Sequence, residues 1–430
     1  MKRTWSLSVI ALASIALVLV ACSEDRTTGP AGQEAFTRYV AVGTSLSMGV
    51  QSDGVVYFSQ QHDWTALLAH AAFASYTQPL VAPPGCFSPL IAPLQFNRRL
   101  SGIPASGTGS DQTKSIPDTT CALFGSITLP ANDVAIDGAN TYDALYVTPE
   151  TASVEGVKRR RQYRLVLPPK TTQVTAMMKQ NPTLVSVELG ANEVLGVASG
   201  LLFPKAGYRG AAATGTFVPN TVWQPVYDQL IDSVKKTGAK ALLAGVPKTT
   251  GFVSIRTGDE LYQDRAEFQA FGVIINPDCQ GSANSIFVPI KVINAVGAAQ
   301  ATGQPQNFSC TDQPGQQDFI LTPADIQTVN TIIDGMNSHI QAVAQQNGWA
   351  YVDFATVWAQ WVAARGPFSL SKLLTCTRPY GQYTSLDGVH PNSDGYQEMA
   401  NAAAAALNTT YSFAIPGLTQ PVLTPAQVCP

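Results

Sequence analysis

The sequence is poor in charged residues. Only 13% of its 430 residues are charged, against 45% that are apolar, and the formal net charge is −3. A chain with so little positive charge lacks the basic surface that binds a phosphate backbone, so no nucleic-acid partner is expected. The apolar fraction is that of an ordinary globular protein with a substantial core.

Several cofactor and metal motifs are absent as well. The sequence contains no Walker-type glycine loop, no HExxH motif and no GxGxxG fingerprint after a predicted strand. None of its cysteines forms a CxxC pair, which argues against a zinc site. The sequence therefore predicts neither a metal nor a cofactor.

Long apolar runs are missing except at the N-terminus. Lys2 and Arg3 precede an apolar run over residues 5–21, and the run ends in Leu-Val-Ala-Cys at Cys22. This pattern is typical of a secretory signal, and its ending resembles a bacterial lipobox in which Cys22 becomes lipidated. The alternative is ordinary cleavage near Ala21. Without a later apolar run long enough to span a bilayer, the rest is expected to be held at the membrane by acyl chains.

These features predict three segments and a location. Residues 1–22 form the lipoprotein signal, 23–36 a short polar tether, and 37–430 the folded domain. Ser23, directly after the lipidated cysteine, resembles lipoproteins that are passed on to the outer membrane. The protein is thus expected to be exported and anchored at the bacterial cell envelope. The sequence leaves its oligomeric state open.

An even number of cysteines follows Cys22, which in an exported protein suggests disulfides. Sequence alone does not choose among the possible pairings, and six free thiols remain an alternative. Pairing in sequence order would staple two insertions, near residues 76–130 and 251–322, and the C-terminal tail. The six cysteines are Cys86, Cys121, Cys279, Cys310, Cys376 and Cys429.

Strand and helix patterns alternate along the rest of the chain. Strands are predicted at residues 38–42, 182–190, 239–246 and 350–353, and helices at 63–72, 171–181, 221–236, 322–346 and 393–407. Both insertions are expected to be irregular. Alternating strands and helices indicate a parallel sheet, in which ligands bind beyond the carboxyl ends of the strands.

Ser45 lies where the first predicted strand ends, in the stretch VAVGTSLSMG. A serine there either caps the next helix or acts as a nucleophile, and a nucleophile needs a base. His390 differs from the other three histidines, because it lies in a tight loop with the carboxylate of Asp387 three residues before it. Such a carboxylate orients an imidazole so that its other nitrogen accepts the serine proton. The remaining three lie in or beside predicted helices, where surface or structural roles predominate: His62, His70 and His339.

These residues resemble the sequence blocks of the SGNH, or GDSL-type, serine hydrolases. Ser45 matches the nucleophile block, and Asp387 and His390 match the Asp-x-x-His block. Gly190-Ala-Asn192 matches the Gly-x-Asn block, and Gly138 in residues 132–139 matches the glycine block. The resemblance implies a catalytic triad of Ser45, His390 and Asp387. It also implies an oxyanion hole formed by the Ser45 and Gly138 N–H groups and the Asn192 amide.

The resemblance further implies a three-layer α/β/α fold with a parallel five-stranded sheet of flavodoxin type, carrying the two insertions. The chain departs from the family at Thr44 and Glu193, where aspartate is usual. Neither position belongs to the triad or the hole. No G-x-S-x-G elbow surrounds Ser45, which disfavours the α/β-hydrolase arrangement.

The resulting hypothesis is a lipid-anchored carboxylic ester hydrolase acting through an acyl-enzyme. Lipid esters, acylated glycans and small esters all remain open as substrates. The alternative is a surface binding lipoprotein on a degenerate hydrolase scaffold, which Thr44, Glu193 and the two insertions would suit.

Overall fold

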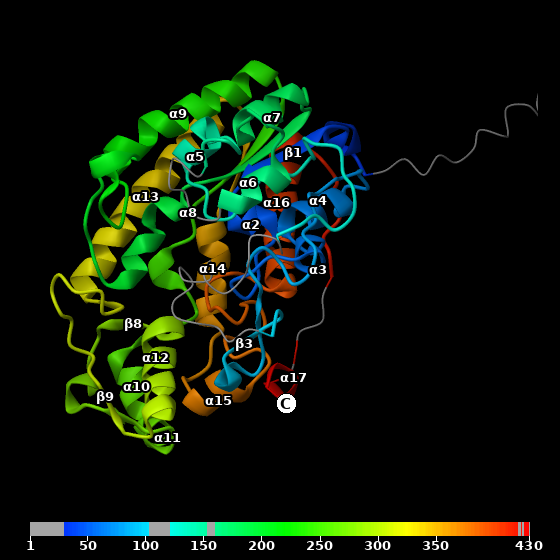
Figure 1. Ribbon diagram of the computed structural model, residues 1–430. Coiled ribbons are helices and arrows are strands. Elements are labelled where there is room, and N and C mark those ends of the chain that lie inside the picture. Colours follow the sequence, from blue (N-terminus) through cyan, green and yellow to red (C-terminus); the bar gives the residue numbers. More distant parts are fainter. Residues whose placement is uncertain (1–29, 103–120, 153–159, 420–422, 424, 430) are drawn as a thin grey trace, which may run out of the picture.

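The structure is a computed structural model that describes residues 30–102, 121–152, 160–419, 423 and 425–429 (Figure 1). The predicted signal segment, Cys22 and the first part of the predicted tether lie outside these residues. No helix among the described residues is long and apolar enough to cross a membrane.

The centre of the molecule is a parallel sheet. Its strands follow the order β1-β4-β5-β11, and all three neighbouring pairs run parallel. All four strands were predicted from the sequence, and they are almost completely buried, as expected for a sheet covered on both faces. Their bounds are β1 (Tyr39–Gly43), β4 (Leu184–Glu188), β5 (Lys240–Ala244) and β11 (Ala350–Val352).

The predicted fifth strand is not confirmed, because the described part of the sheet has four strands. The segment 132–136 occupies the outer side of β1 instead. Its backbone exchanges hydrogen bonds with Ala41 (2.9 and 3.0 Å), and the Ile136 N–H donates to the Gly43 carbonyl at 3.1 Å. Only one bridge, between Ala41 and Asp133, has strand geometry. The segment therefore carries the chain to the sheet edge without forming a regular strand.

Helices cover both faces of the sheet and make it the middle of three layers. One face packs against α4 (Trp64–Ala71), α14 (Phe354–Ala363) and α16 (Ser393–Tyr411). The other packs against α5 (Thr141–Tyr146), α6 (Arg160–Val166), α7 (Gln173–Lys179), α9 (Asn220–Thr237) and α13 (Pro323–Gln346). The five predicted helices correspond to α4, α7, α9, α13 and α16. Figure 1 shows α9 and α13 on the outside of this layer.

The second insertion is not irregular, contrary to the prediction. It forms a lobe at the lower left of Figure 1, built from short strands and helices. An antiparallel sheet joins β10 (Ile320–Leu321), β8 (Ser285–Phe287) and β6 (Ile255–Thr257), and β7 (Val273–Ile275) pairs with β9 (Gln306–Phe308). The helices are α10 (Gly258–Gln263), α11 (Arg265–Ala270) and α12 (Val288–Thr302). Strands of two or three residues are too short to show a period in the sequence.

The three disulfides pair the cysteines in sequence order, so each insertion and the C-terminal tail carries a staple. The pairs are Cys86–Cys121, Cys279–Cys310 and Cys376–Cys429. The described part of the first insertion contains β2 (Leu90–Ile91), η2 (Leu94–Phe96) and β3 (Arg98–Arg99). α15 (Leu370–Thr375) precedes Cys376.

The cap of α4 makes stability depend on pH. The Asp63 carboxylate is fully buried and accepts the N–H groups of Thr65 and Ala66, at 2.7 and 2.8 Å. Burial outweighs these bonds and raises the pKa of Asp63 to about 7. Between the ordinary aspartate pKa of about 4 and this value, the folded protein holds a proton that the unfolded chain has lost. Stability therefore falls as pH rises through this window.

Asp63→Asn keeps a good cap but cannot ionise, so its free energy of unfolding should fall less steeply between about pH 4 and 7. Part of the pH dependence should remain in this variant, because burial also raises the pKa of Asp133. Urea unfolding at several pH values measures this, with the exposed Asp232→Asn as control. Equal slopes in Asp63→Asn and the unsubstituted protein would contradict the prediction.

Candidate active site

Ser45 is the first residue of the short helix α2 (Ser45–Met48), directly after β1. Thr44 before it is extended, so the chain turns sharply at the strand end. Gly43 permits this turn, because a Cβ there would lie 2.4 Å from the Ser47 hydroxyl oxygen. Gly49, with φ of 78°, ends the helix in the left-handed conformation that glycine adopts without strain. The serine is thus held in a tight strand-to-helix turn.

A carboxylate from the neighbouring strand anchors this turn. Glu188, the last residue of β4, lies opposite Gly43 in the parallel register. Its carboxylate accepts the Thr44 N–H and the Thr44 hydroxyl, each at 2.9 Å, and the Ser47 hydroxyl at 3.1 Å. Glu188 thus places an acidic group beside Thr44, the position at which the SGNH family that the sequence resembles usually has aspartate. The sequence analysis missed this residue, although an acidic residue inside an apolar strand was a visible signal.

Glu188 is only 3% exposed. Burial raises its pKa to about 7, against the lowering effect of the hydrogen bonds from Thr44 and Ser47. The uncharged form of Glu188 is therefore favoured more than that of an exposed glutamate. A second carboxylate beside Glu188 would be shielded from solvent, so the repulsion between the two charges would be poorly screened.

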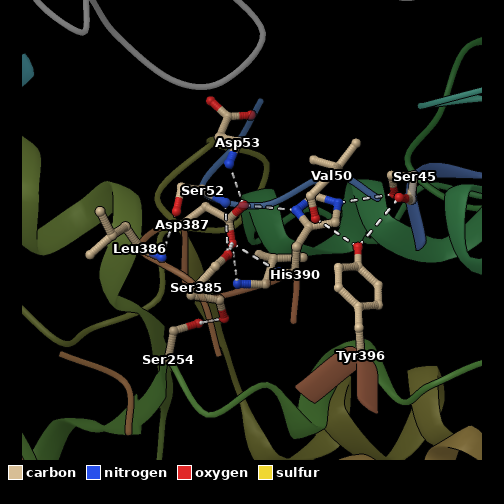
Figure 2. Close-up of polar contacts among 12 residues, drawn as sticks. Ser45, Val50, Ser52, Asp53, Ser254, Ser385, Leu386, Asp387, His390 and Tyr396 are labelled. Carbon is tan, nitrogen blue, oxygen red and sulfur yellow. Dashed lines mark hydrogen bonds and ion pairs between the residues drawn. The ribbon is translucent and has the colours of Figure 1, made fainter. Parts of the chain in front are cut away.

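His390 connects Ser45 to Asp387 (Figure 2). Its Nε2 lies 2.9 Å from the Ser45 Oγ, and its Nδ1 lies 2.8 Å from the Asp387 Oδ2. With Nδ1–H donating to the carboxylate, Nε2 is left to accept the serine hydroxyl proton; this tautomer follows from the hydrogen-bond network. The three residues come from opposite ends of the chain, and the structure brings them together as the sequence predicted.

The Asp387 carboxylate accepts several backbone N–H groups in addition to the imidazole. Its Oδ1 accepts the N–H groups of Val389 and His390, both at 2.8 Å, and its Oδ2 accepts that of Asp53. Burial alone would raise the pKa of Asp387, but the imidazole and these bonds outweigh it and hold the pKa below its ordinary value. Asp387 is therefore a carboxylate at neutral pH.

Asn192 and Glu193 tie the Gly-x-Asn segment to the glycine segment. The Asn192 amide nitrogen donates to the Ala139 carbonyl at 2.8 Å, and the Glu193 Oε1 accepts the Thr141 N–H at 2.8 Å and the Tyr208 hydroxyl at 3.2 Å. Glu193 thus fastens the segment that follows Gly138. Gly138 has φ of 76°, a conformation that requires glycine or costs strain.

These residues line one cavity of about 420 Å³. Ser45, His390, Gly138 and Asn192 all face it. Most of the apolar side chains in the remaining lining come from the two insertions, and apolar walls with a few polar groups are typical of a small-molecule site. The three other histidines lie elsewhere: His62 precedes α4, His70 is in α4, and His339 in α13 pairs with Asp228 at 2.7 Å.

Comparison with known proteins gives distant structural similarities. No family model matches the sequence, and no curated protein matches it. An alpha/beta hydrolase from the metagenome of Lake Arreo, Spain, is 12% identical, over 86% of this chain and 96% of that chain, with a TM-score of 0.35. A protein described as a GDSL-like lipase from Parabacteroides merdae is 10% identical, over 86% and 95%, with a TM-score of 0.34.

The Glu188 contacts predict that an aspartate at position 44, where the SGNH family usually has one, destabilises this protein. Thr44→Asp would place a second carboxylate beside Glu188 in a buried site, so one of the two must stay protonated. We expect a loss of about 2–4 kcal/mol in the free energy of unfolding. Adding Glu188→Gln removes the repulsion and keeps an acceptor for the Thr44 N–H position, so the double variant should recover most of the loss. Denaturant unfolding of the two single variants and the double variant measures this coupling, and strictly additive losses would contradict it.

Proposed function

We propose that the protein is a serine hydrolase that cleaves carboxylic esters through an acyl-enzyme. The observation that carries the proposal is the hydrogen-bonded series Ser45–His390–Asp387, with distances of 2.9 and 2.8 Å, at the wall of a cavity. A serine hydroxyl becomes a nucleophile when an oriented base removes its proton. The resemblance to the SGNH family supports the same chemistry.

In the proposed reaction, the Ser45 Oγ attacks the ester carbonyl carbon while His390 Nε2 takes its proton. Asp387 stabilises the resulting imidazolium and keeps the ring in place. The tetrahedral intermediate collapses as His390 returns the proton to the leaving alcohol, which leaves the acyl group on Ser45. Water then attacks the acyl-enzyme by the same route, releases the acid and restores the serine.

The developing oxyanion would be stabilised by the N–H groups of Ser45 and Gly138 and by the Asn192 amide. Ser45 is the first residue of α2, so its N–H has no partner four residues earlier within the helix. The Asn192 amide nitrogen carries a second hydrogen beyond the one donated to Ala139. Loss of one oxyanion donor commonly costs about 10²–10³ in rate. The leader pattern ending at Cys22 supports placing this activity at the cell envelope, with the protein lipid-anchored there.

Ser45→Ala should reduce hydrolysis of a p-nitrophenyl ester by at least about 10³-fold, because the nucleophile is lost. His390→Ala should give a similar loss. His339→Ala is a matched control, since His339 also pairs with an aspartate but lies outside the cavity. Steady-state assays of the purified proteins measure these effects.

A fluorophosphonate probe separates this proposal from the binding-module alternative. Covalent labelling of Ser45 in the folded protein, lost in Ser45→Ala, is expected of an active nucleophile. Absence of labelling together with absence of ester hydrolysis would overturn the enzyme assignment and favour a binding role for the cavity.

A further inference from the structure

A largely apolar wall, which also carries the polar residues Ser199, Asn294 and Gln317, leads away from Asn192. After Asn192, η5 (Leu195–Ser199) contributes Leu195 and Ala198 to the cavity lining. The Ser199 carbonyl accepts the Phe319 N–H at 2.9 Å, and the Phe319 carbonyl accepts the Phe287 N–H at 3.0 Å. Phe287 directly precedes α12. Through these backbone hydrogen bonds, the wall extends from η5, which follows Asn192, to the second insertion.

Helix α12 forms the far part of this wall. Ile290 and Ile293 face the cavity, one helical turn apart, and both are half-buried. The opposite side of α12 is buried in the core of the insertion through Val292, Val296 and other residues. The start of the helix packs on the His390 loop, because a Cβ on Gly388 would lie 2.8 Å from the Pro289 Cγ. The two isoleucines are therefore held on a firmly packed element.

We propose that this wall is the acyl-chain subsite of the enzyme, that the substrates are fatty-acyl esters, and that Ile290 and Ile293 limit chain length. The inference rests on the proposed function. The acyl carbonyl must lie at Asn192, so the chain that follows it meets the wall beginning at Leu195. The wall contains no charged side chain; the charged residues of the cavity, Asp53, Arg99, Asp137 and Asp387, come from other segments.

The apolar wall favours an acyl chain over an acetyl group. Each fully buried methylene contributes enough to raise kcat/KM by about fourfold, while an acetyl group has none to bury. An acetylated glycan would leave most of the wall without a partner. We therefore expect kcat/KM to rise from p-nitrophenyl acetate through the butyrate to the octanoate.

Ile293→Trp should fill part of the subsite and shift the preference toward short chains. We expect kcat/KM for the octanoate to fall at least about 10-fold, with the acetate changed by less than about 3-fold. Gln300→Trp is the matched control, because it adds the same side chain on the exposed part of the same helix. Should Ile293→Trp fail to fold, Ile290→Phe tests the same wall.

Three results would overturn the subsite while leaving the esterase assignment intact. They are Ser45-dependent hydrolysis that is fastest with the acetate, an equal effect of Ile293→Trp on all chain lengths, and an equal effect of Gln300→Trp. Failure of the proposed function is distinct, because it removes hydrolysis and fluorophosphonate labelling altogether.

An independent observation concerns the turn that supports Asp387. Ser52 and Asp53 have φ of 55° and 60°, and Gln51 pairs with Gly54 through two backbone hydrogen bonds. Two successive residues with positive φ form a tight hairpin turn that usually needs Asn or Gly. Strain of this kind persists only where surrounding contacts maintain it.

Those contacts come from both ends of the chain. The Ser52 N–H donates to the Ser385 hydroxyl at 2.8 Å, and the Asp53 N–H donates to the Asp387 Oδ2 (Figure 2). Arg99, which is 3% exposed, donates to the Asp53 carboxylate at 2.9 Å and to the Ser88 carbonyl at 2.7 Å. The stapled first insertion thereby braces the turn that holds the acidic residue.

We infer that Arg99 and Asp53 are positioning residues for Asp387, acting through the Asp53 N–H, an inference that also rests on the proposed function. Arg99→Met and Asp53→Asn should each lower kcat by roughly 10-fold with KM nearly unchanged. The double variant should have a kcat no lower than that of either single variant, because both substitutions remove the same ion pair between Arg99 and Asp53. Arg99→Lys keeps the charge and should recover part of the loss. Lys248→Met, in an exposed ion pair, is the control.

The charge changes in the two single variants have opposite signs, which makes the test discriminating. A purely electrostatic effect on His390 would move kcat in opposite directions and would overturn the inference. Unchanged kcat per fluorophosphonate-labelled site, with only the unfolding temperature lowered, would show a merely structural role. Additive losses in the double variant would also contradict it.

Discussion

The buried carboxylate of Glu188 is the interaction on which the rest of the site depends. It joins the ends of β1 and β4 at the point where the chain leaves the sheet for Ser45. Backbone and hydroxyl donors surround it and offset part of the cost of burying the group, although burial still raises its pKa. Because an acidic group comes from the adjacent strand, hydrogen bonds hold the turn at Thr44 although residue 44 itself has no carboxyl group. The strand pairing and the serine geometry are therefore a single structural unit.

The sheet and the insertions contribute different residues to the cavity. Strand ends and the loop before α16 place Ser45, Asp387 and His390, whereas the insertions supply most of the apolar lining. Arg99 of the stapled first insertion contacts Asp53, whose N–H donates to Asp387. Phe319 of the second insertion donates its N–H to Ser199, at the end of η5, which follows Asn192. Under the proposed function, the chemistry would thus reside on the sheet and its loops, and the selectivity on the two insertions.

Local sequence patterns made the main strands and helices, and the loop with Asp387 and His390, predictable. The main strands and helices have clear periods, and Asp387 with His390 form a readable loop motif, so these were found in the sequence. Glu188 was not, because its role exists only in the β1–β4 register, which pairs it with Gly43. The strands of the second insertion are too short to show periodicity. The segment 132–136 pairs with β1 through too few strand-like residues to complete the sheet. Long-range pairing, rather than composition, decided each of these cases.

The hydrogen bond between Ser45 and His390 spans 345 residues of chain. A contact so distant in sequence forms late in folding, because the intervening loop must first be closed. Helix α16 must dock beside α4 before the His390 imidazole reaches Ser45. During synthesis, Ser45 therefore emerges long before His390. Under the proposed function, a truncated molecule would carry Ser45 as an ordinary alcohol, and reactivity would arise only once the whole domain has assembled.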